Sequence, residues 1–162
     1  MRAPLRVARR GEGATIRGFR EDGMRIYFAG AILGGRENVP VYQHVVSRLK
    51  ALGCVVPTEH VADPRVLERE GSLEDRHIYE RDVRWIQESD AMVAEVSTPS
   101  LGVGYEICSA LNQGKRVLCL YRQGLAISKM ITGNSSPHIT MAPYRDETEL
   151  DQALEQFVER RK

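Results

Sequence analysis

One stretch of this sequence, residues 90–112, constrains the fold more than any other. An apolar run, Ala91–Val96, is long enough for one buried strand, and the turn-rich segment Ser97–Gly104 follows it. Beyond that segment apolar residues recur at helical spacing, and Gly114 is placed to end the helix. A strand that is followed by a loop of small residues and then by the start of a helix has a characteristic geometry. It points unpaired backbone N–H groups at one spot, where an anion binds well.

Three residues of this stretch could carry chemistry. Ser100 adds a hydroxyl to the loop, and Gly102 removes a side chain that would block close approach. Glu106 lies about one helical turn further on, where a carboxylate tends to stay ionised, so it could be a nucleophile or an electrostatic stabiliser. A lone Glu here is more often a solvated helix residue, but the adjacent loop favours a function. The stretch therefore predicts a site for a phosphorylated small molecule.

Length and charge limit the classes of protein to consider. The 162 residues fit one domain, which we expect to span residues 24–162. Met1–Asp22 holds six arginines against three acidic residues, which leaves 17 basic against 19 acidic residues in the rest. Because the body of the chain is nearly neutral, nucleic acid is not expected to be its main partner. Residues 1–23 lack apolar periodicity and a secretory segment, so we expect either a disordered leader or a chain that really begins at Met24.

The cysteines and the apolar runs indicate a cytoplasmic protein. Cys54, Cys108 and Cys119 are scattered in apolar contexts, cannot all pair and show no metal-binding spacing, which is typical of a reducing compartment. No apolar run approaches the roughly 20 residues that a membrane helix needs. We therefore expect neither a metal nor a membrane to be involved.

The remaining patterns alternate between strands and helices. Five strands are predicted, at Met24–Gly30, Cys54–His60, Ala91–Val96, Arg116–Tyr121 and His138–Tyr144. Helices are predicted at Val39–Leu52 and Leu73–Ser89, after Gly104, and at Glu147–Arg161, with a short one in Gly124–Gly133. Ala62–Ser72 is polar and reads as a short helix or a lid. Pro57 suggests that the second strand lies at an edge of the sheet.

This alternation predicts an α/β fold with three layers. Right-handed crossovers give a flavodoxin-like (Rossmann-like) sheet of five parallel strands in the order 2-1-3-4-5. Strands 1 and 3 flank the switch point, and ligands bind there at the carboxyl ends of the strands. Residues 27–36 and 97–106 should therefore line one crevice.

Three further side chains near this crevice each allow two interpretations. Asp82 is either a second acid of the site or an exposed helix residue. Tyr27 is either a plain strand aromatic or a source of a hydroxyl at the end of the crevice. His60 ends the second predicted strand and is either a ligand contact or a surface histidine.

Several segments together resemble a known family. They are Tyr27–Gly30 with Gly34–Arg36, then Thr58–His60, Asp82, and Pro99–Glu106. This combination resembles the 2′-deoxynucleoside 5′-phosphate N-hydrolases, a branch of the nucleoside 2-deoxyribosyltransferase superfamily, over about residues 24–144. The resemblance implies a homodimer that cleaves the N-glycosidic bond of 2′-deoxynucleoside 5′-monophosphates, giving free base and 2-deoxyribose 5-phosphate without a cofactor.

The resemblance also implies roles for single residues. Glu106 looks like the nucleophile, with Asp82 and Tyr27 as its catalytic partners. Ser100 and Gly102 look like phosphate contacts, and Ser128 looks like one that reaches in from the other subunit. Further substrate contacts are implied at Gly30, Ile32, Leu33, Gly34, Tyr42, His60 and Met130.

Two positions of one loop depart from the family pattern. The family loop commonly reads Gly-Ser-Ile-Arg-Gly-Gly-Arg, whereas this chain has Ala31 in place of the Ser and Leu33 in place of the Arg. Leucine cannot bind a phosphate, so the preference for nucleotides over nucleosides should be weaker here. Two alternatives stay open at this point: a 2-deoxyribosyltransferase that uses the same site, and a non-catalytic nucleotide-binding module, since one fold serves many functions.

Overall fold

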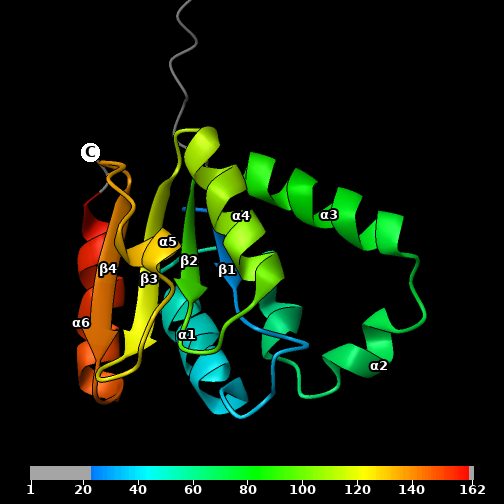
Figure 1. Ribbon diagram of the computed structural model, residues 1–162, viewed down its shortest axis with the longest axis horizontal. Helices are drawn as coiled ribbons and strands as arrows, with labels where there is room; N and C mark the ends of the chain where they lie inside the picture. The colour runs from blue at the N-terminus through cyan, green and yellow to red at the C-terminus, as the bar shows by residue number, and fades with distance from the viewer. Residues whose placement is uncertain (1–22, 161–162) are drawn as a thin grey trace, which may run out of the picture.

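A parallel β-sheet between two layers of helices forms the body of the molecule (Figure 1). The computed structural model describes residues 23–160, so the prediction for residues 1–23 falls almost entirely outside it. In their order across the sheet, the strands are β1 (Ile26–Ala29), β2 (Ala91–Glu95), β3 (Arg116–Arg122) and β4 (Ile139–Tyr144). The longer helices of the described residues are α1 (Val39–Ala51), α3 (Asp75–Glu88), α4 (Leu101–Asn112) and α6 (Glu147–Glu159). The short ones are the 3-10 helix η1 (Glu59–Ala62), α2 (Val66–Glu70) and α5 (Lys129–Thr132).

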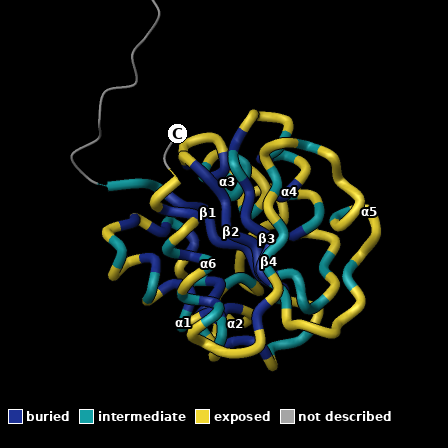
Figure 2. Tube along the Cα trace, turned by 90° about the vertical axis from the view of Figure 1, so that its left-hand side faces the viewer, coloured by how far each residue is buried: buried dark blue, intermediate teal, exposed yellow. Residues whose placement is uncertain are grey.

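Alternate side chains of each strand enter two different cores. Ile26 and Phe28 of β1 pack with α1 and α6, whereas Tyr27 and Ala29 face the layer of α3 and α4. This is the period of two that a strand buried on both faces must show. Figure 2 shows the strands as the most buried part of the chain, with exposed segments around them.

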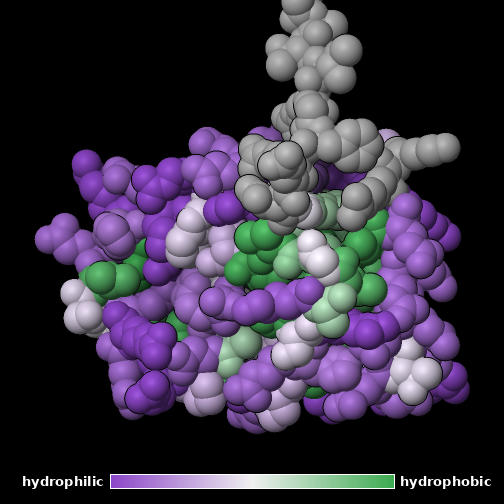
Figure 3. All heavy atoms as spheres, turned by 180° about the vertical axis from the view of Figure 1, so that it is seen from behind, coloured by the Kyte–Doolittle hydropathy of each residue, from purple (hydrophilic) through white to green (hydrophobic). Residues whose placement is uncertain are grey.

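The outer surface follows from the amphipathic pattern of the helices. In α6 the residues Leu150, Leu154, Phe157 and Val158 are buried, while acidic and amide side chains fill most of the other positions. Seen from behind, the molecule is mostly hydrophilic around its periphery (Figure 3). Within residues 23–160, every helix is too short or too polar to cross a membrane.

The sheet has four strands rather than the five predicted. The segment predicted as the second strand forms only one parallel bridge, between Val55 and Arg25, and then turns into η1. Pro57 has no N–H to offer to a ladder. The hydroxyl of Thr58 takes over at this edge: it accepts from the Phe28 N–H (2.9 Å) and donates to the Phe28 carbonyl (2.7 Å). One side chain thus satisfies the backbone groups of β1 that a fifth strand would otherwise have paired.

Helix α4 begins earlier than its sequence pattern indicated. The segment Ser97–Gly104 was expected to be a loop, but the helix starts at Leu101, so Gly102 and Gly104 both lie inside it. Ser100 is the N-cap, and its hydroxyl accepts a hydrogen bond from the Val103 N–H (3.3 Å). Capping and packing against the sheet outweigh the roughly 1 kcal/mol that each glycine costs in a helix.

The Thr58 bridge leads to a stability prediction. Replacing Thr58 with valine keeps the shape of a fully buried side chain but leaves the N–H and C=O groups of Phe28 without partners. We expect the free energy of unfolding to fall by about 2–4 kcal/mol, because each buried unpaired group costs about 1–3 kcal/mol. Denaturant titration measures this loss. The matched control is Thr148→Val at an exposed position of α6, and an equal effect of both substitutions would contradict this role for Thr58.

Candidate active site

A tyrosine from β1 and a carboxylate from α4 meet between the sheet and the helix layer. The Tyr27 hydroxyl donates a hydrogen bond to Glu106 Oε1 at 2.5 Å. Tyr27 is buried and Glu106 is half-buried, on the side of α4 that faces β1 and α3. The two residues are 79 positions apart, so only the parallel packing of β1, β2 and α4 brings them together.

Burial controls the ionisation of this pair. It raises the pKa of Glu106 to about 7, and the charges of Asp82 and Glu70 add to the rise, while the Tyr27 hydrogen bond and Arg81 oppose it. Burial also raises the pKa of Tyr27 far above its ordinary value, with Glu106 and Asp82 adding to it. Tyr27 therefore remains a donor, and Glu106 titrates near neutral pH. The helix N-terminus was expected to keep Glu106 ionised, but desolvation outweighs it.

A second group of charges lies beside this pair, on α2 and α3. Arg81 Nε is 2.8 Å from Asp82 Oδ1, and Arg81 Nη2 is 3.2 Å from Asp82 Oδ2 and 2.6 Å from Glu70 Oε1. The same Glu70 oxygen lies 3.3 Å from His60 Nε2. His60, predicted at the end of a strand, lies instead in η1. Both Asp82 and His60 thus belong to one charged network next to Glu106.

Aromatic residues border this network. The rings of His60 and Trp85 are tilted, with centroids 5.6 Å apart, and the Arg81 guanidinium lies 5.0 Å from the centre of the Trp85 ring. Leu73 and Val66 join them around a hollow of about 350 Å³. An apolar, aromatic hollow with a few charged groups is suited to a flat heterocycle.

The two segments predicted to line one crevice, residues 27–36 and 97–106, lie against each other in the structure. A Cβ on Gly34 would lie 2.9 Å from the carbonyl oxygen of Pro99, so only glycine allows the two loops to approach this closely. Asn38 Nδ2 also donates to Thr98 Oγ1 at 3.0 Å. The two segments thus meet where the carboxyl ends of β1 and β2 reach the start of α4, and a ligand-binding crevice between them stays a prediction.

The other predicted contacts in the first loop have distinct environments. Ile32 is half-buried against the core, whereas Leu33 is 90% exposed. Gly30 lies against the ring of Tyr42, since a Cβ on Gly30 would come within 2.9 Å of it. Tyr42 has 0% exposure, so it supports Gly30 from the core, and its direct contact with a substrate stays a prediction.

Predicted phosphate contacts lie on another side of α4. A groove of about 580 Å³ runs between α4 and the segment that contains α5, and Ser100, Ser128 and Met130 all line it. Gly102 is exposed in the first turn of α4. Figure 1 shows α4 between α3 and α5, so the groove and the charged network flank opposite sides of this helix.

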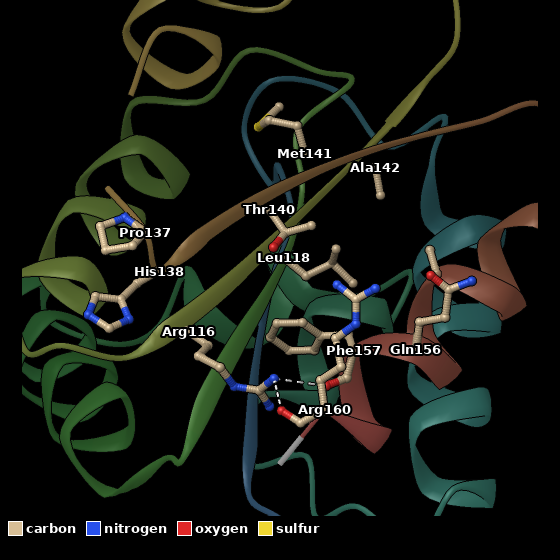
Figure 4. Close-up of a pocket in the computed structure, with 11 residues that line it drawn as sticks. Arg116, Leu118, Pro137, His138, Thr140, Met141, Ala142, Gln156, Phe157 and Arg160 are labelled. Carbon is tan, nitrogen blue, oxygen red and sulfur yellow. Dashed lines mark hydrogen bonds between the residues drawn. The ribbon is translucent and has the colours of Figure 1, made fainter. Parts of the chain in front are cut away.

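A further hollow of about 340 Å³ lies far from this chemistry, between the sheet and α6 (Figure 4). Its main cation, Arg116, donates to the carbonyl oxygens of Phe157 and Arg160 at the end of α6 and lies 4.6 Å from the centre of the Phe157 ring. These contacts explain Arg116 as a cap for the helix C-terminus. In residues 23–160, no three His, Cys, Asp or Glu side chains are grouped so that they could hold a metal ion.

Sequence reasoning missed Arg81, Glu70 and Trp85. One signal was available, because Arg81 and Trp85 are four residues apart and therefore share a face of the predicted helix. Glu70 carried none, since it lies in the polar segment 62–72 and meets Arg81 only through the tertiary fold.

Known proteins are similar to most of this chain. The model of the nucleoside 2-deoxyribosyltransferase family matches residues 26–152. A 5-hydroxymethyl-dUMP N-hydrolase from Danio rerio is 42% identical over 139 residues, which cover 84% of this chain and 96% of that protein. The protein of the same name from Homo sapiens is 42% identical over 138 residues, which cover 83% of this chain and 79% of that one.

Solved structures share the fold. A CMP N-glycosidase from Clostridium botulinum superposes with a TM-score of 0.63 at 20% identity, over 82% of this chain and 98% of its own. A 2-deoxyribosyltransferase from Bacillus psychrosaccharolyticus gives a TM-score of 0.59 at 23% identity, over 78% and 90% of the two chains.

The raised pKa of Glu106 predicts how stability depends on pH. The folded protein holds this proton up to about pH 7, whereas an unfolded Glu loses it near pH 4.5, so the cost of burying the charge is absent below about 4.5 and complete above about 7. Glu106→Gln removes the charge and keeps an oxygen for the Tyr27 hydroxyl. We expect this variant to be more stable than the wild type at pH 8, by on the order of 2 kcal/mol, and nearly equal to it at pH 4.5. Denaturant titrations at both pH values measure this, and a difference that does not change with pH would contradict it.

Proposed function

The chain belongs to the nucleoside 2-deoxyribosyltransferase family, and we propose that it hydrolyses the N-glycosidic bond of 2′-deoxynucleoside 5′-monophosphates to free base and 2-deoxyribose 5-phosphate. The observation that carries the proposal is the Tyr27–Glu106 hydrogen bond at the predicted crevice, with Asp82 beside it. The N-hydrolase names of relatives 42% identical to this chain support the reaction type.

Glu106 is the proposed nucleophile. As the bond between C1′ and the base nitrogen breaks, its electron pair leaves with the base and the sugar becomes oxocarbenium-like. An ionised Glu106 then bonds to C1′, and water later hydrolyses this glycosyl-enzyme. The Tyr27 hydroxyl holds one carboxylate oxygen, which fixes the direction of the other. Because the pKa of Glu106 is about 7, a substantial fraction is ionised at neutral pH.

Asp82 is the proposed second carboxyl group. It protonates the departing base as the bond from C1′ to the base nitrogen breaks, and its carboxylate then takes a proton from the water that hydrolyses the glycosyl-enzyme, so Asp82 ends the cycle as it began. Its side chain is 22% exposed and is held by Arg81, so it is neither a free surface acid nor fully enclosed. The hollow bordered by His60, Trp85 and Arg81, which binds Asp82, is where we place the base.

The start of α4 is the proposed phosphate site. Ser100 and the backbone at Gly102 lie there, and the N-terminus of a helix of this length attracts an anion. A phosphate held at this point would place C1′ near Glu106, which is an orientation effect. Leu33, exposed at the rim, offers the phosphate no charge, so we expect a smaller advantage of monophosphates over nucleosides than in relatives that carry Arg there. A 2′-hydroxyl would withdraw electrons and crowd the site, which favours deoxy substrates.

The reaction as proposed uses protein side chains and water, without a cofactor. Among the described residues Cys108 and Cys119 form no disulfide, which fits a reducing compartment, and we propose that the protein acts in the cytoplasm.

The proposed function is tested by the products. Purified protein is incubated with each deoxynucleoside, its 5′-monophosphate and the matching ribonucleotide, and free base is measured. We expect base release from deoxynucleotides, and Glu106→Ala should lower its rate by roughly a few hundredfold or more, because the covalent route is lost. The matched control is Glu68→Ala, an exposed glutamate of α2.

Other outcomes identify the alternatives. Base release that requires an acceptor base would indicate a transferase. Tight binding of deoxynucleotide without turnover by the wild type would indicate a binding module. Near-normal base release by Glu106→Ala would contradict the assignment of the nucleophile.

We also propose that the working unit is a homodimer in which Ser128 completes the partner's site. Leu101 and Met130 are 97% and 83% exposed on the α4 and α5 side, an apolar surface suited to burial against a second copy. Ser128 lines the groove on this same side of α4, so it lies at the surface that the second copy would cover. A twofold dimer would then contain two equivalent sites.

Mixing two inactive variants tests the shared site. Glu106→Ala chains are combined with Ser128→Trp chains under conditions where exchange is demonstrated. If Ser128 serves the partner, each mixed dimer has one site with both lesions and one intact site, so about a quarter of wild-type activity should return. If Ser128 serves its own chain, no site is intact and no activity returns, and sedimentation as an active monomer would contradict the model equally.

A further inference from the structure

Arg81 occupies a place unlike that of an ordinary surface arginine. Its side chain is only 12% exposed. Its guanidinium contacts both oxygens of Asp82, one oxygen of Glu70 and the face of Trp85. These contacts fix the guanidinium from α2 and from two positions of α3.

The surroundings of Glu106 explain why such a cation is needed. The groups that act on it are the Tyr27 hydroxyl from β1, Asp82 and Arg81 from α3, and Glu70 from α2. Three carboxyl groups therefore share a small, half-buried space, and like charges in such a space resist ionisation together. Arg81 contacts two of them directly and opposes their effect on the third.

The geometry also limits where Asp82 can point. Adjacent residues of a helix project about 100° apart, so Asp82 and Arg81 do not face each other by default. Here the planar guanidinium takes both Asp82 oxygens at once, an arrangement that fixes the carboxylate plane in a way a lysine ammonium cannot.

We propose that Arg81 is a positioning residue with two separable effects. Its paired guanidinium N–H groups set the orientation of Asp82, and its charge keeps Asp82 and Glu70 from suppressing the ionisation of Glu106. The catalytic part of this inference rests on the proposed function. Arg81 itself touches no reacting atom in the proposed mechanism.

Three variants separate the two effects. Arg81→Met keeps the length of the side chain and its contact with Trp85 but removes the positive charge and the paired N–H groups that bind Asp82. The pKa of Glu106 should therefore rise, and the acid limb of the kcat/KM profile should move to higher pH by about one pH unit. The plateau value of kcat should also fall, by about tenfold or more, because Asp82 loses its orientation. Arg81→Lys keeps the charge without the paired N–H groups, so its acid limb should stay near that of the wild type while its plateau remains low.

Glu70→Gln should shift the acid limb of the pH profile in the opposite direction to Arg81→Met. Glu70 raises the pKa of Glu106, so removing its charge should move the acid limb to lower pH. A residue that merely stabilises the fold would not produce opposite shifts when either partner of an ion pair is neutralised. The matched control is Arg84→Met, an exposed arginine on the same helix, which should leave the profile unchanged.

A measurement without substrate keeps the inference independent of the proposed function. The side-chain carboxyl of Glu106 is titrated by ¹³C NMR in each variant, and its signal is identified by its loss in Glu106→Gln. Thermal denaturation confirms that each variant is folded. If the wild type releases no base from any nucleotide, the proposed function fails, while the titration still decides whether Arg81 governs Glu106. Titration midpoints that are equal in the wild type and Arg81→Met, or that shift the same way in Arg81→Met and Glu70→Gln, would overturn the inference.

Discussion

The hydrogen bond between Tyr27 and Glu106 is the contact on which the rest of the site depends. It joins the innermost layer of the molecule to α4, and it places a carboxylate where water is partly excluded. Desolvation then sets the chemistry, because a carboxyl group in such a place keeps its proton to about pH 7. A group that is costly to ionise is also a reactive one once ionised, so in the proposed mechanism the protein gives up stability at the position of its nucleophile.

The loops around this pair are held by side chains that take the place of missing backbone partners. Thr58 closes the outer edge of β1 through two bonds to Phe28. At the end of β2, the buried Glu95 accepts hydrogen bonds from Ser97 and from Tyr144, and Ser97 also accepts one from the Arg122 N–H. The ends of β2, β3 and β4 are thereby tied together beside the loop that leads into α4. A site on loops gains precision when the loops are fixed in this way.

Helix α4 divides the surroundings of the site into two regions of different character. Charged and aromatic groups gather on the side of α2 and α3, where Arg81 balances Asp82 and Glu70. Apolar residues line the groove on the side of α5, with Ser100 and Ser128 as polar exceptions. A nucleotide has the same division, with a flat base at one end and a phosphate at the other, and Glu106 lies on the helix between the two regions. The apolar surface on the side of α5 is the one that we propose a second copy covers.

The sequence by itself determined the strands β1 to β4, the long helices and the meeting of residues 27–36 with 97–106. These features follow from apolar periodicity and from the rule that carboxyl ends of parallel strands share one edge, and both can be read locally. It also singled out Glu106, because a glycine-flanked loop precedes it. The tertiary structure alone decided that the segment Cys54–His60 forms one bridge instead of the predicted strand. It alone also decided the early start of α4 and the burial of Tyr42 behind Gly30. It alone decided that Glu106 holds its proton to near neutral pH and that Arg81 and Glu70 belong to its surroundings. The reason is physical: a helix N-terminus acts through a few neighbouring residues, whereas desolvation and ion pairing depend on groups that are distant in the chain and close only in the folded state.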